Sequence, residues 1–262
     1  MPKAPENLRE FNGLLQVVEA LRGPDGCPWD KEQTHASLTR YAIEEAFELA
    51  EAIDSQDQKT ICDELGDVLL QVVLHAEIAR QAKTFDILDV IENLNQKMVR
   101  RHPHVFADTQ AADSTEVLKN WAAIKAEEKG QAKDHPLSFD IPAGLPALLR
   151  SQKIGEKTKK VSFDWQNAEQ CWPKVHEEIA ELEEAIATGN TESMTQELGD
   201  VLFSLSQLAR HLKIDSEQAL RQTNQRFETR FQKMQQLVRH DKLNWDDLPD
   251  GDKEKYWKKA KA

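Results

Sequence analysis

The chain has few of the residues that build strands, tight turns and disulfide-stabilised folds. Its 262 residues include only ten glycines, ten prolines, two tyrosines and three cysteines. Cys27, Cys62 and Cys171 are scattered and odd in number, which argues against a disulfide framework or a zinc site and fits a reduced, cytosolic setting. Glu, Lys, Leu, Ala and Gln are abundant instead, and this balance favours helices over strands.

Two further absences restrict the functions that the chain can have. Positive charge is in deficit, and the net charge of −12 argues against non-specific binding to nucleic-acid polymers or anionic membranes. No apolar run approaches the ~20 residues that a membrane-spanning helix needs, and the N-terminus opens no apolar signal-peptide core. We therefore expect a cytoplasmic protein that binds neither membrane nor nucleic-acid polymer. An anionic small molecule is still compatible if a divalent cation mediates the contact.

What the sequence does contain is one pattern of acids written twice. The pattern comprises Glu44, Glu45, Glu48, Glu64 and Asp67 in the first copy and Glu177, Glu178, Glu181, Glu197 and Asp200 in the second. Corresponding residues lie 133 positions apart throughout, so the gap between the two halves of the pattern is repeated as well. Surface acids tend to drift between duplicated halves, whereas these have stayed in step.

The duplication predicts two related domains. Apolar residues recur at helical spacing over 6–22, 37–54, 57–83, 86–101 and 114–129, and again over 146–159, 170–187, 191–212, 215–240 and 252–261. Residues 23–28 form a loop that delivers Trp29 and Asp30. Residues 130–146 contain Gly and Pro and sustain no helical stripe. We predict an all-α fold of two tandem helical bundles, residues 1–129 and 147–262, joined by a linker of residues 130–146.

Two expectations concern the first pair of acid-bearing helices. The apolar side chains expected to point into the core are Ile43, Phe47, Ala50 and Ile53 on the first helix and Ile61, Leu65, Val68, Leu69, Val72 and Val73 on the second. Gly66 stands inside the second of these helices, where glycine costs up to ~1 kcal/mol relative to alanine. We expect such a glycine where another backbone, or a bound ion with its ligands, comes close.

The spacing of the acids predicts two metal sites. Residues three apart lie on one face of a helix, so each acid pair presents two carboxylates side by side. Two such helices packed antiparallel bring four carboxylates together, and their repulsion calls for a cation. Hard oxygen ligands at this density suit Mg²⁺, with Mn²⁺ also possible. The predicted ligands are Glu45, Glu48, Glu64 and Asp67 in the first copy and Glu178, Glu181, Glu197 and Asp200 in the second.

A second duplicated feature lies downstream of each acid pattern. Asn95-Gln96-Lys97-Met98 and Arg101 match Asn224-Gln225-Arg226-Phe227 and Arg230 at a separation of 129, and Trp121 has a counterpart in Trp257. Cations beside a metal site suit a polyphosphate, and an aromatic plane gives a base a surface for stacking. We favour phosphate contact for Arg226 and Arg230. In the alternative reading these arginines pair with acids on neighbouring helices and the tryptophans belong to the core.

Two other classes of function compete with this interpretation. A di-metal carboxylate oxidase in a helical bundle needs Glu-x-x-His pairs, and no His stands three residues after any of the key glutamates. A non-enzymatic helical module that binds nucleotide or a protein partner needs no catalytic residues at all.

The acid patterns resemble those of the MazG family of all-α nucleoside triphosphate pyrophosphohydrolases. The resemblance covers nearly the whole length, and it is supported by Gly26-Cys27-Pro28-Trp29-Asp30, by Arg100-Arg101-His102-Pro103-His104-Val105-Phe106 and by Leu145-Pro146-Ala147-Leu148. It implies hydrolysis of a nucleoside triphosphate between its α and β phosphates, which yields nucleoside monophosphate and pyrophosphate. It also implies a homodimer whose active-site bundles include helices of the partner chain.

The resemblance assigns roles to individual residues. The eight acids named above are the implied metal ligands. The implied nucleotide contacts are Lys174, Glu178, Gln196, Asp200, Arg226, Phe227, Glu228, Arg230 and Trp257. Glu177, or a ligand itself such as Glu178, then takes the proton of the attacking water. Lys174, Arg226 and Arg230 stabilise the developing phosphate charge.

The two halves are equipped differently around the same acids. Position 174 is Lys, whereas the matching position in the first half is Tyr41, and Arg226-Phe227 replaces Lys97-Met98. The second half is therefore better suited to hold phosphates and to stack a base. We predict that most or all turnover belongs to residues 147–262.

Overall fold

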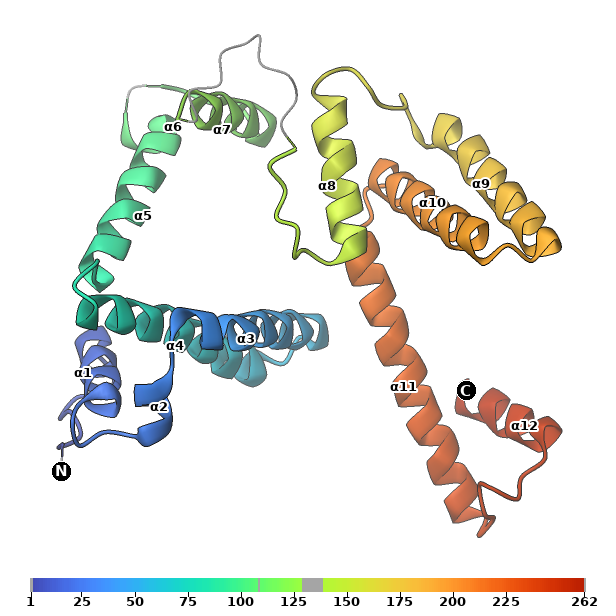
Figure 1. Cartoon of the computed structure of the whole chain (residues 1–262), viewed down its shortest axis with the longest axis horizontal. Helices are drawn as coiled ribbons and strands as arrows, with labels where there is room; N and C mark the ends of the chain where they lie inside the picture. The colour runs from blue at the N-terminus through green and yellow to red at the C-terminus, as the bar shows by residue number, and fades with distance from the viewer. Residues whose placement is uncertain (1, 108, 129–138, 262) are drawn as a thin grey trace. The chain divides into compact units, whose positions relative to one another are not determined.

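The computed structural model describes residues 2–107, 109–128 and 139–261, and within these ranges it contains helices and no strand (Figure 1). The helices are α1 (Phe11–Arg22), α2 (Pro28–Glu32), α3 (His35–Ser55), α4 (Gln58–Gln81), α5 (Ile87–Arg101), α6 (Pro103–Phe106), α7 (Ser114–Glu128), α8 (Ala147–Lys159), α9 (Ala168–Thr188), α10 (Thr191–His211), α11 (Ser216–His240) and α12 (Asp250–Lys261). The predicted all-α fold class is confirmed. None of the described helices has the length and apolarity needed to cross a membrane.

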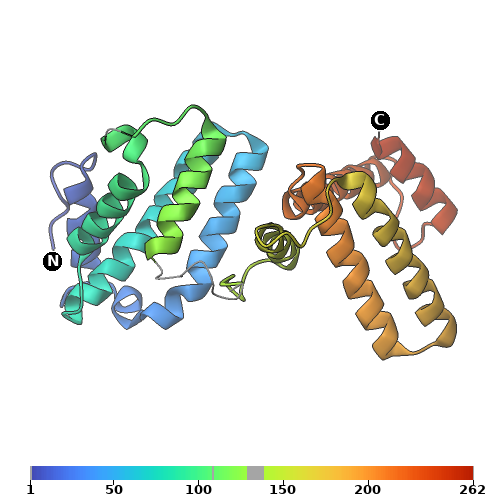
Figure 2. The ribbon, with the colours of Figure 1, turned by 90° about the horizontal axis from the view of Figure 1, so that it is seen from above.

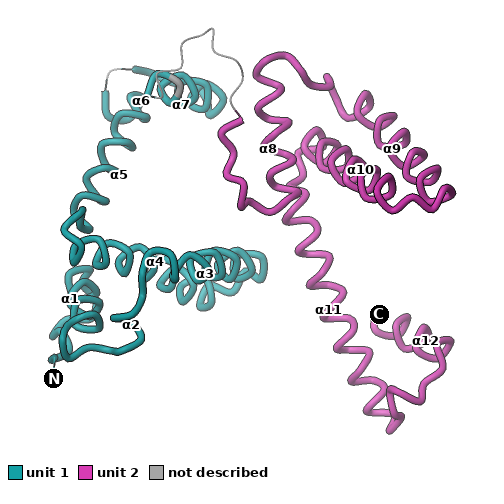
Figure 3. Tube along the Cα trace, in the orientation of Figure 1, with its two compact units in different colours: residues 1–133 teal, residues 134–262 magenta. Residues whose placement is uncertain are grey.

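The chain divides into two compact units, residues 1–133 and 134–262 (Figure 3). The division falls inside the segment predicted as a linker, of which residues 130–138 lie outside the described chain. The predicted limits of the linker stay a prediction.

The first unit is centred on the hairpin of α3 and α4. Thr34 begins α3 with a capping box, because its hydroxyl accepts from the Ser37 backbone N–H at 3.1 Å and the Ser37 hydroxyl accepts from the Thr34 N–H at 2.9 Å. Gln56 ends α3 in the left-handed conformation, and Asp57 caps α4. Helices α1 and α5 both pack on α4. The core between α1, α3 and α4 contains Val18, Leu38, Val73 and Leu74.

The second unit repeats this hairpin with α9 and α10, which lie side by side in both views (Figures 1 and 2). Asn167 caps α9, Gly189 ends it in the left-handed conformation, and Asn190 caps α10. Helix α8 packs on α10 and α11, and α12 folds back on α11. One small core, of Cys171, Val175 and Leu208, lies under the hairpin. A second core, between α11 and α12, contains Met234, Val238, Leu248, Tyr256 and Ala260.

Several local predictions need correction. Helix α1 begins at Phe11 rather than near residue 6, because Asn7 holds the preceding turn through hydrogen bonds to Glu10 and to the Arg9 N–H. Trp29 and Asp30 lie in the short helix α2 rather than in a loop. A further short helix, α6, follows the end of α5. Proline occupies the first position of α2 and of α6, where its missing N–H is not needed.

The expected inward face of the first hairpin is wrong for most of its residues, although Val73 is buried in the core and Ala50, Ile61 and Val68 are partly buried. The apolar side chains on this face that are substantially exposed are Ile43, Phe47, Ile53, Leu65, Leu69 and Val72. Gly66 shows the same openness, because no atom within 4 Å would meet a Cβ added there. Helices α1 and α5 cover one side of α4, and this opposite side has no cover within the described part of the unit.

Candidate metal and nucleotide site

In the second unit, three carboxylates converge from the two helices of the hairpin. Glu178 on α9 and Glu197 and Asp200 on α10 each offer an oxygen within 4.8 Å of the others. Glu178 is buried, with only 7% of its surface exposed. The i, i+3 spacing on α10 and the antiparallel packing of α9 therefore bring these three carboxylates together, as the sequence predicts.

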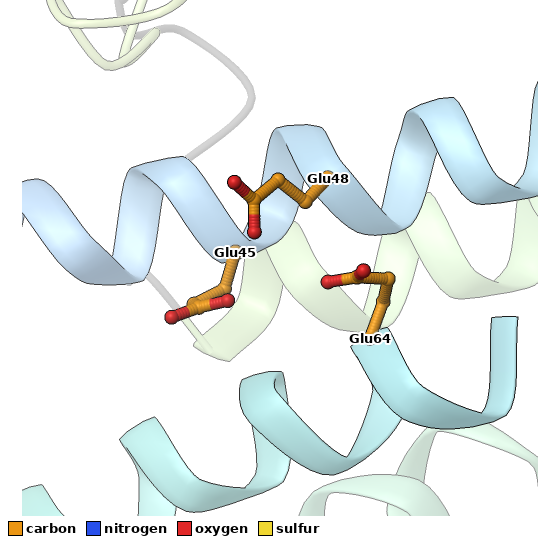
Figure 4. A group of neighbouring side chains, drawn as sticks. All are labelled: Glu45, Glu48 and Glu64. Carbon is orange, nitrogen blue, oxygen red and sulfur yellow. The ribbon is translucent and has the colours of Figure 1, made fainter. Parts of the chain in front are cut away.

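The first unit brings together an overlapping group, in which the counterpart of Glu181 takes part instead of the counterpart of Asp200. Glu45 and Glu48 on α3 and Glu64 on α4 also lie within 4.8 Å of one another. Figure 4 shows the three side chains reaching from two helices into one space. One carboxylate oxygen of Glu64, Oε2, is buried and has no hydrogen-bond partner. A buried oxygen without a partner is unfavourable, so this site favours a positively charged ligand.

The fourth acid of each set lies outside the converging group, but it interacts electrostatically with it. Desolvation raises the pKa of Glu45, and the next contribution comes from the charge of Asp67. Desolvation also raises the pKa of Glu181, followed by a hydrogen bond with Glu178. Three of the four predicted ligands converge in each unit. That all four acids of a set bind a metal ion stays a prediction.

The donor set fits a divalent cation. Carboxylate oxygens are the hard ligands that Mg²⁺ and Mn²⁺ take, and three or four of them leave coordination positions for water and phosphate oxygens. Desolvation and then the charge of Glu48 raise the pKa of Glu64, as expected where carboxylates repel one another. The residues that would hold the cation are the two converging groups, with Asp67 and Glu181 beside them.

Lys174 gives the second site a cation of its own. Its ammonium lies 2.8 Å from Glu177 Oε1 and 2.8 Å from Glu178 Oε1. These contacts, first with Glu177 and then with Glu178, raise the pKa of Lys174 above its ordinary value. In the first unit, Tyr41 holds the matching position and packs edge-on against Trp29 with ring centroids 5.7 Å apart. No described Lys or Arg forms an ion pair with Glu45, Glu48 or Glu64.

The predicted phosphate-binding arginines lie in the middle of α11. Arg226 donates to the Thr223 hydroxyl at 2.7 Å, and neither Arg226 nor Arg230 is in an ion pair with a described residue. Arg101 in the first unit differs, because it lies 2.5 Å from a Glu128 carboxylate oxygen and over the ring of Trp121. The alternative reading, in which such arginines pair with acids, thus describes the first unit and not the second.

An aromatic surface accompanies these arginines. Phe227 on α11 lies 5.1 Å from Trp257 on α12, measured between ring centroids, and is 56% exposed. Gln196 and Glu228 are also exposed. Within the second unit, this surface and the acids of the α9–α10 hairpin are not brought together, because α12 packs on α11 and lies away from that hairpin (Figure 1).

Sequence reasoning missed a pocket beside the second acid group. The pocket has a volume of about 490 Å³ and is lined by residues that include Ile154, Phe163, Asp164, Trp165, Phe203 and Gln207. Phe203 lies one helical turn beyond Asp200, so the pocket adjoins the acids along α10. Trp165 both lines the pocket and packs on the core under the hairpin, which makes it a loop anchor with one accessible face.

A buried ion-pair network fixes one wall of this pocket. Arg210 donates to both oxygens of Asp164, at 2.9 and 2.5 Å, and His211 lies 3.2 Å from the same carboxylate. Burial alone would raise the pKa of Asp164, but hydrogen bonds and charge from Arg210 and then His211 lower it below its ordinary value. The sequence signal for this network is Arg210 followed by His211 at the end of an apolar helix. Their partner lies 46 and 47 positions away in the sequence.

Comparison with known proteins identifies the family of the chain. The MazG nucleotide pyrophosphohydrolase domain matches residues 33–106 and 166–235, which together exceed half of the chain and contain both acid groups. The chain belongs to the MazG nucleotide pyrophosphohydrolase family. The predicted family, and with it the prediction of an enzyme, is confirmed.

Two relatives match over most of their length, and a third matches over less than half of its length. The chain is 45% identical over 252 residues to the nucleoside triphosphate pyrophosphohydrolase/pyrophosphatase MazG of Thermotoga maritima, and the match covers 96% of each chain. It is 42% identical over 234 residues to the nucleoside triphosphate pyrophosphohydrolase of Escherichia coli K12, covering 88% of this chain and 89% of that one. A nucleoside triphosphate pyrophosphohydrolase of Mycobacterium tuberculosis is 40% identical over 138 residues, which are 52% of this chain and 41% of that one.

Proposed function

We propose that this protein hydrolyses nucleoside triphosphates between the α and β phosphates, with Mg²⁺ or Mn²⁺, to nucleoside monophosphate and pyrophosphate. The observation that carries the proposal is the convergence of carboxylates from both helices of a hairpin, in each unit of a MazG-family chain. Family membership supports the substrate class, and the donor set supports the divalent cation. A cytoplasmic location is part of the proposal and is supported by three free cysteines.

The residues of the second unit have distinct roles in this mechanism. A divalent cation, when bound by Glu178, Glu197 and Asp200, supplies neutralisation of phosphate charge and acidification of the attacking water. In this proposal Glu177, whose side chain is 56% exposed and pairs with Lys174, accepts the proton of that water. Lys174 stabilises the charge that develops on the phosphate oxygens as the bond breaks.

The nucleoside part of the substrate has a place close to the acids. The pocket beside α10 is lined by Phe163, Trp165 and Phe203, whose rings offer the apolar and stacking contacts that a base uses. It lies one turn from Asp200 on the same helix, so a triphosphate held at the acids leaves its nucleoside within reach. Phe227 and Trp257 offer a second aromatic surface, which the second unit does not place beside its own acids.

A homodimer completes the proposal. The α9–α10 hairpin exposes apolar side chains, Ile179, Leu198, Leu202 and Leu205, as the α3–α4 hairpin does. Gly199, like Gly66, has open space where a Cβ would stand, although glycine weakens a helix. A second copy packed on these faces would bury the apolar side chains and use the room at the glycines. It would also supply Arg226, Arg230 and Trp257 to the acids of the α9–α10 hairpin.

Two glutamate-to-glutamine variants, one in each unit, test the proposed reaction and which unit carries it out. Pyrophosphate release from a panel of triphosphates with Mg²⁺ is measured for the wild type, for Glu178→Gln and for Glu45→Gln, and ³¹P NMR identifies the products. We expect Glu178→Gln to lose at least ~10²-fold in kcat and Glu45→Gln to keep most of the activity, because only the second unit carries Lys174. Release of inorganic phosphate instead of pyrophosphate would overturn the proposed cleavage. Loss from Glu45→Gln alone would overturn its location in the second unit.

A further inference from the structure

We propose that Lys174 and the divalent cation compete for the carboxylate of Glu178. In this view the cation displaces the ammonium when it binds, and the displaced ammonium becomes available to the triphosphate. The inference rests on the proposed function, because it presumes that the acids of the second unit hold a divalent cation. It adds a coupling between cation and nucleotide that the acids alone do not provide.

The geometry makes the two cations incompatible at close range. The Lys174 ammonium lies 2.8 Å from Glu178 Oε1, and the same carboxylate belongs to the group with Glu197 and Asp200. A divalent ion at its ligand distance of about 2.1 Å would therefore stand within a few ångströms of the ammonium. Like charges at that separation repel strongly, most of all around a side chain such as Glu178, of which 9% is exposed.

Lys174 is able to leave. Its side chain is 36% exposed, and four flexible methylenes connect the ammonium to the backbone, so the ammonium can move while the helix stays in place. The second ion pair, with Glu177, joins it to a side chain that is 56% exposed and moves as freely. A bound triphosphate offers the displaced ammonium new oxygen partners. Nucleotide binding should therefore tighten cation binding, and the coupling is reciprocal.

The first unit provides an internal comparison. It also gathers three acids, Glu45, Glu48 and Glu64, but Tyr41 stands in place of Lys174 and no described cation pairs with the three acids. A divalent ion meets no competitor there. Without nucleotide, the first site should therefore hold the ion more tightly than the second, although the second has the better equipment for substrate.

Electron paramagnetic resonance of Mn²⁺ measures this directly on the full-length chain without nucleotide. Glu45→Gln with Glu64→Gln leaves only the second site, and Glu178→Gln with Glu197→Gln leaves only the first. In the second-site protein, Lys174→Met should tighten Mn²⁺ binding on the order of tenfold, because the competing charge is removed. Lys174→Arg, which keeps the charge, is the matched control and should leave the affinity close to that of its parent. Circular dichroism confirms that each variant is folded.

Each outcome separates the inference from the function on which it rests. Mn²⁺ binding that needs the acids but is unchanged or weakened by Lys174→Met would overturn the competition and leave the proposed metal site standing. No Mn²⁺ binding by either single-site protein would overturn the metal-dependent function itself. An α,β-methylene triphosphate, which resists the proposed cleavage, should tighten Mn²⁺ binding to the second site more in its parent than in Lys174→Met. Equal tightening in both would contradict the release of Lys174.

Discussion

Carboxylates gathered on a helix hairpin destabilise one another, and single residues decide how each unit accommodates them. In the first unit, desolvation and neighbouring acids raise the pKa of Glu45 and of Glu64, and one oxygen of Glu64 has no partner. In the second unit, Lys174 forms ion pairs with Glu177 and Glu178. Lys174 against Tyr41 is therefore one residue difference that sets the charge balance of the second acid group apart from that of the first.

The close contact between α8 and α10 depends on one residue, Gly155. A Cβ at this position would lie 1.9 Å from Gln207 Oε1 and 2.6 Å from Arg210 Nε. Gln207 cannot easily move away, because it is 1% exposed and its amide donates to the Ser151 carbonyl at 2.7 Å. Gly155 is therefore a packing residue rather than a flexible point in α8.

Gly155→Ala should lower the free energy of unfolding of the second unit by ~1–3 kcal/mol, as overpacking of a filled core does. Urea unfolding followed by circular dichroism measures the change. Glu156→Ala, on the exposed side of the same helix, is the control and should change the midpoint little. An unchanged midpoint for Gly155→Ala would show that Gln207 and Arg210 yield to the new methyl group without cost.

At the level of elements, the two hairpins use the same turn with different residues. Gln56 ends α3 at φ 59° and ψ 16°, and Gly189 ends α9 at φ 69° and ψ 15°. Asp57 and Asn190 then cap the following helices. The left-handed conformation costs a residue with a Cβ roughly 1–2 kcal/mol, a cost that glycine does not have.

Gln56→Gly should therefore raise the free energy of unfolding of the first unit, by ~0.5–1 kcal/mol after the greater freedom of glycine in the unfolded chain is subtracted. The opposite change, Gly189→Ala, should lower the free energy of unfolding of the second unit by a similar amount. Thermal unfolding monitored at several wavelengths compares the two with the wild type. Shifts of the same sign in both variants would contradict a shared turn conformation.

The sequence predicts these elements well because their signals are local. Helical periodicity and capping residues such as Thr34, Asp57 and Asn190 define both hairpins to within a few residues, and the duplicated acids predict the two groups that converge. The helices α2 and α6 were missed because neither is long enough to show a period. The ion pair of Asp164 with Arg210 was missed because its partners are distant in the sequence.

At the scale of the whole molecule, the sequence does not predict what covers the exposed apolar faces. Periodicity identifies the apolar stripe of Leu65, Leu69 and Val72, but it does not say what covers that stripe. The structure leaves the stripe open, and within the second unit it places Trp257 on α12, which lies away from the α9–α10 hairpin. Both observations are accounted for if a second copy of the chain packs against the first.

A mixing experiment distinguishes a site shared between chains from a site within one chain. Glu178→Gln removes an acid, Arg226→Ala removes a phosphate-binding cation, and each variant alone should be inactive. If the acids of one chain work with Arg226 of the other, a mixed dimer has one site with both residues intact and one site with neither. An equimolar mixture that has been allowed to exchange chains should then recover about a quarter of the wild-type kcat, because half of the dimers are mixed and half of their sites are intact.

Light scattering coupled to size exclusion gives the oligomeric state of the wild type, the single variants and the mixture. Leu202→Glu, which places a charge on the exposed face of the α9–α10 hairpin, should weaken association and abolish the recovery in the mixture. A mixture that stays inactive while the proteins are dimeric and exchange chains would assign the acids and Arg226 to a site within one chain. In that case α11 must bend toward the α9–α10 hairpin before the phosphates can be held, and the second copy would serve only to bury the apolar faces.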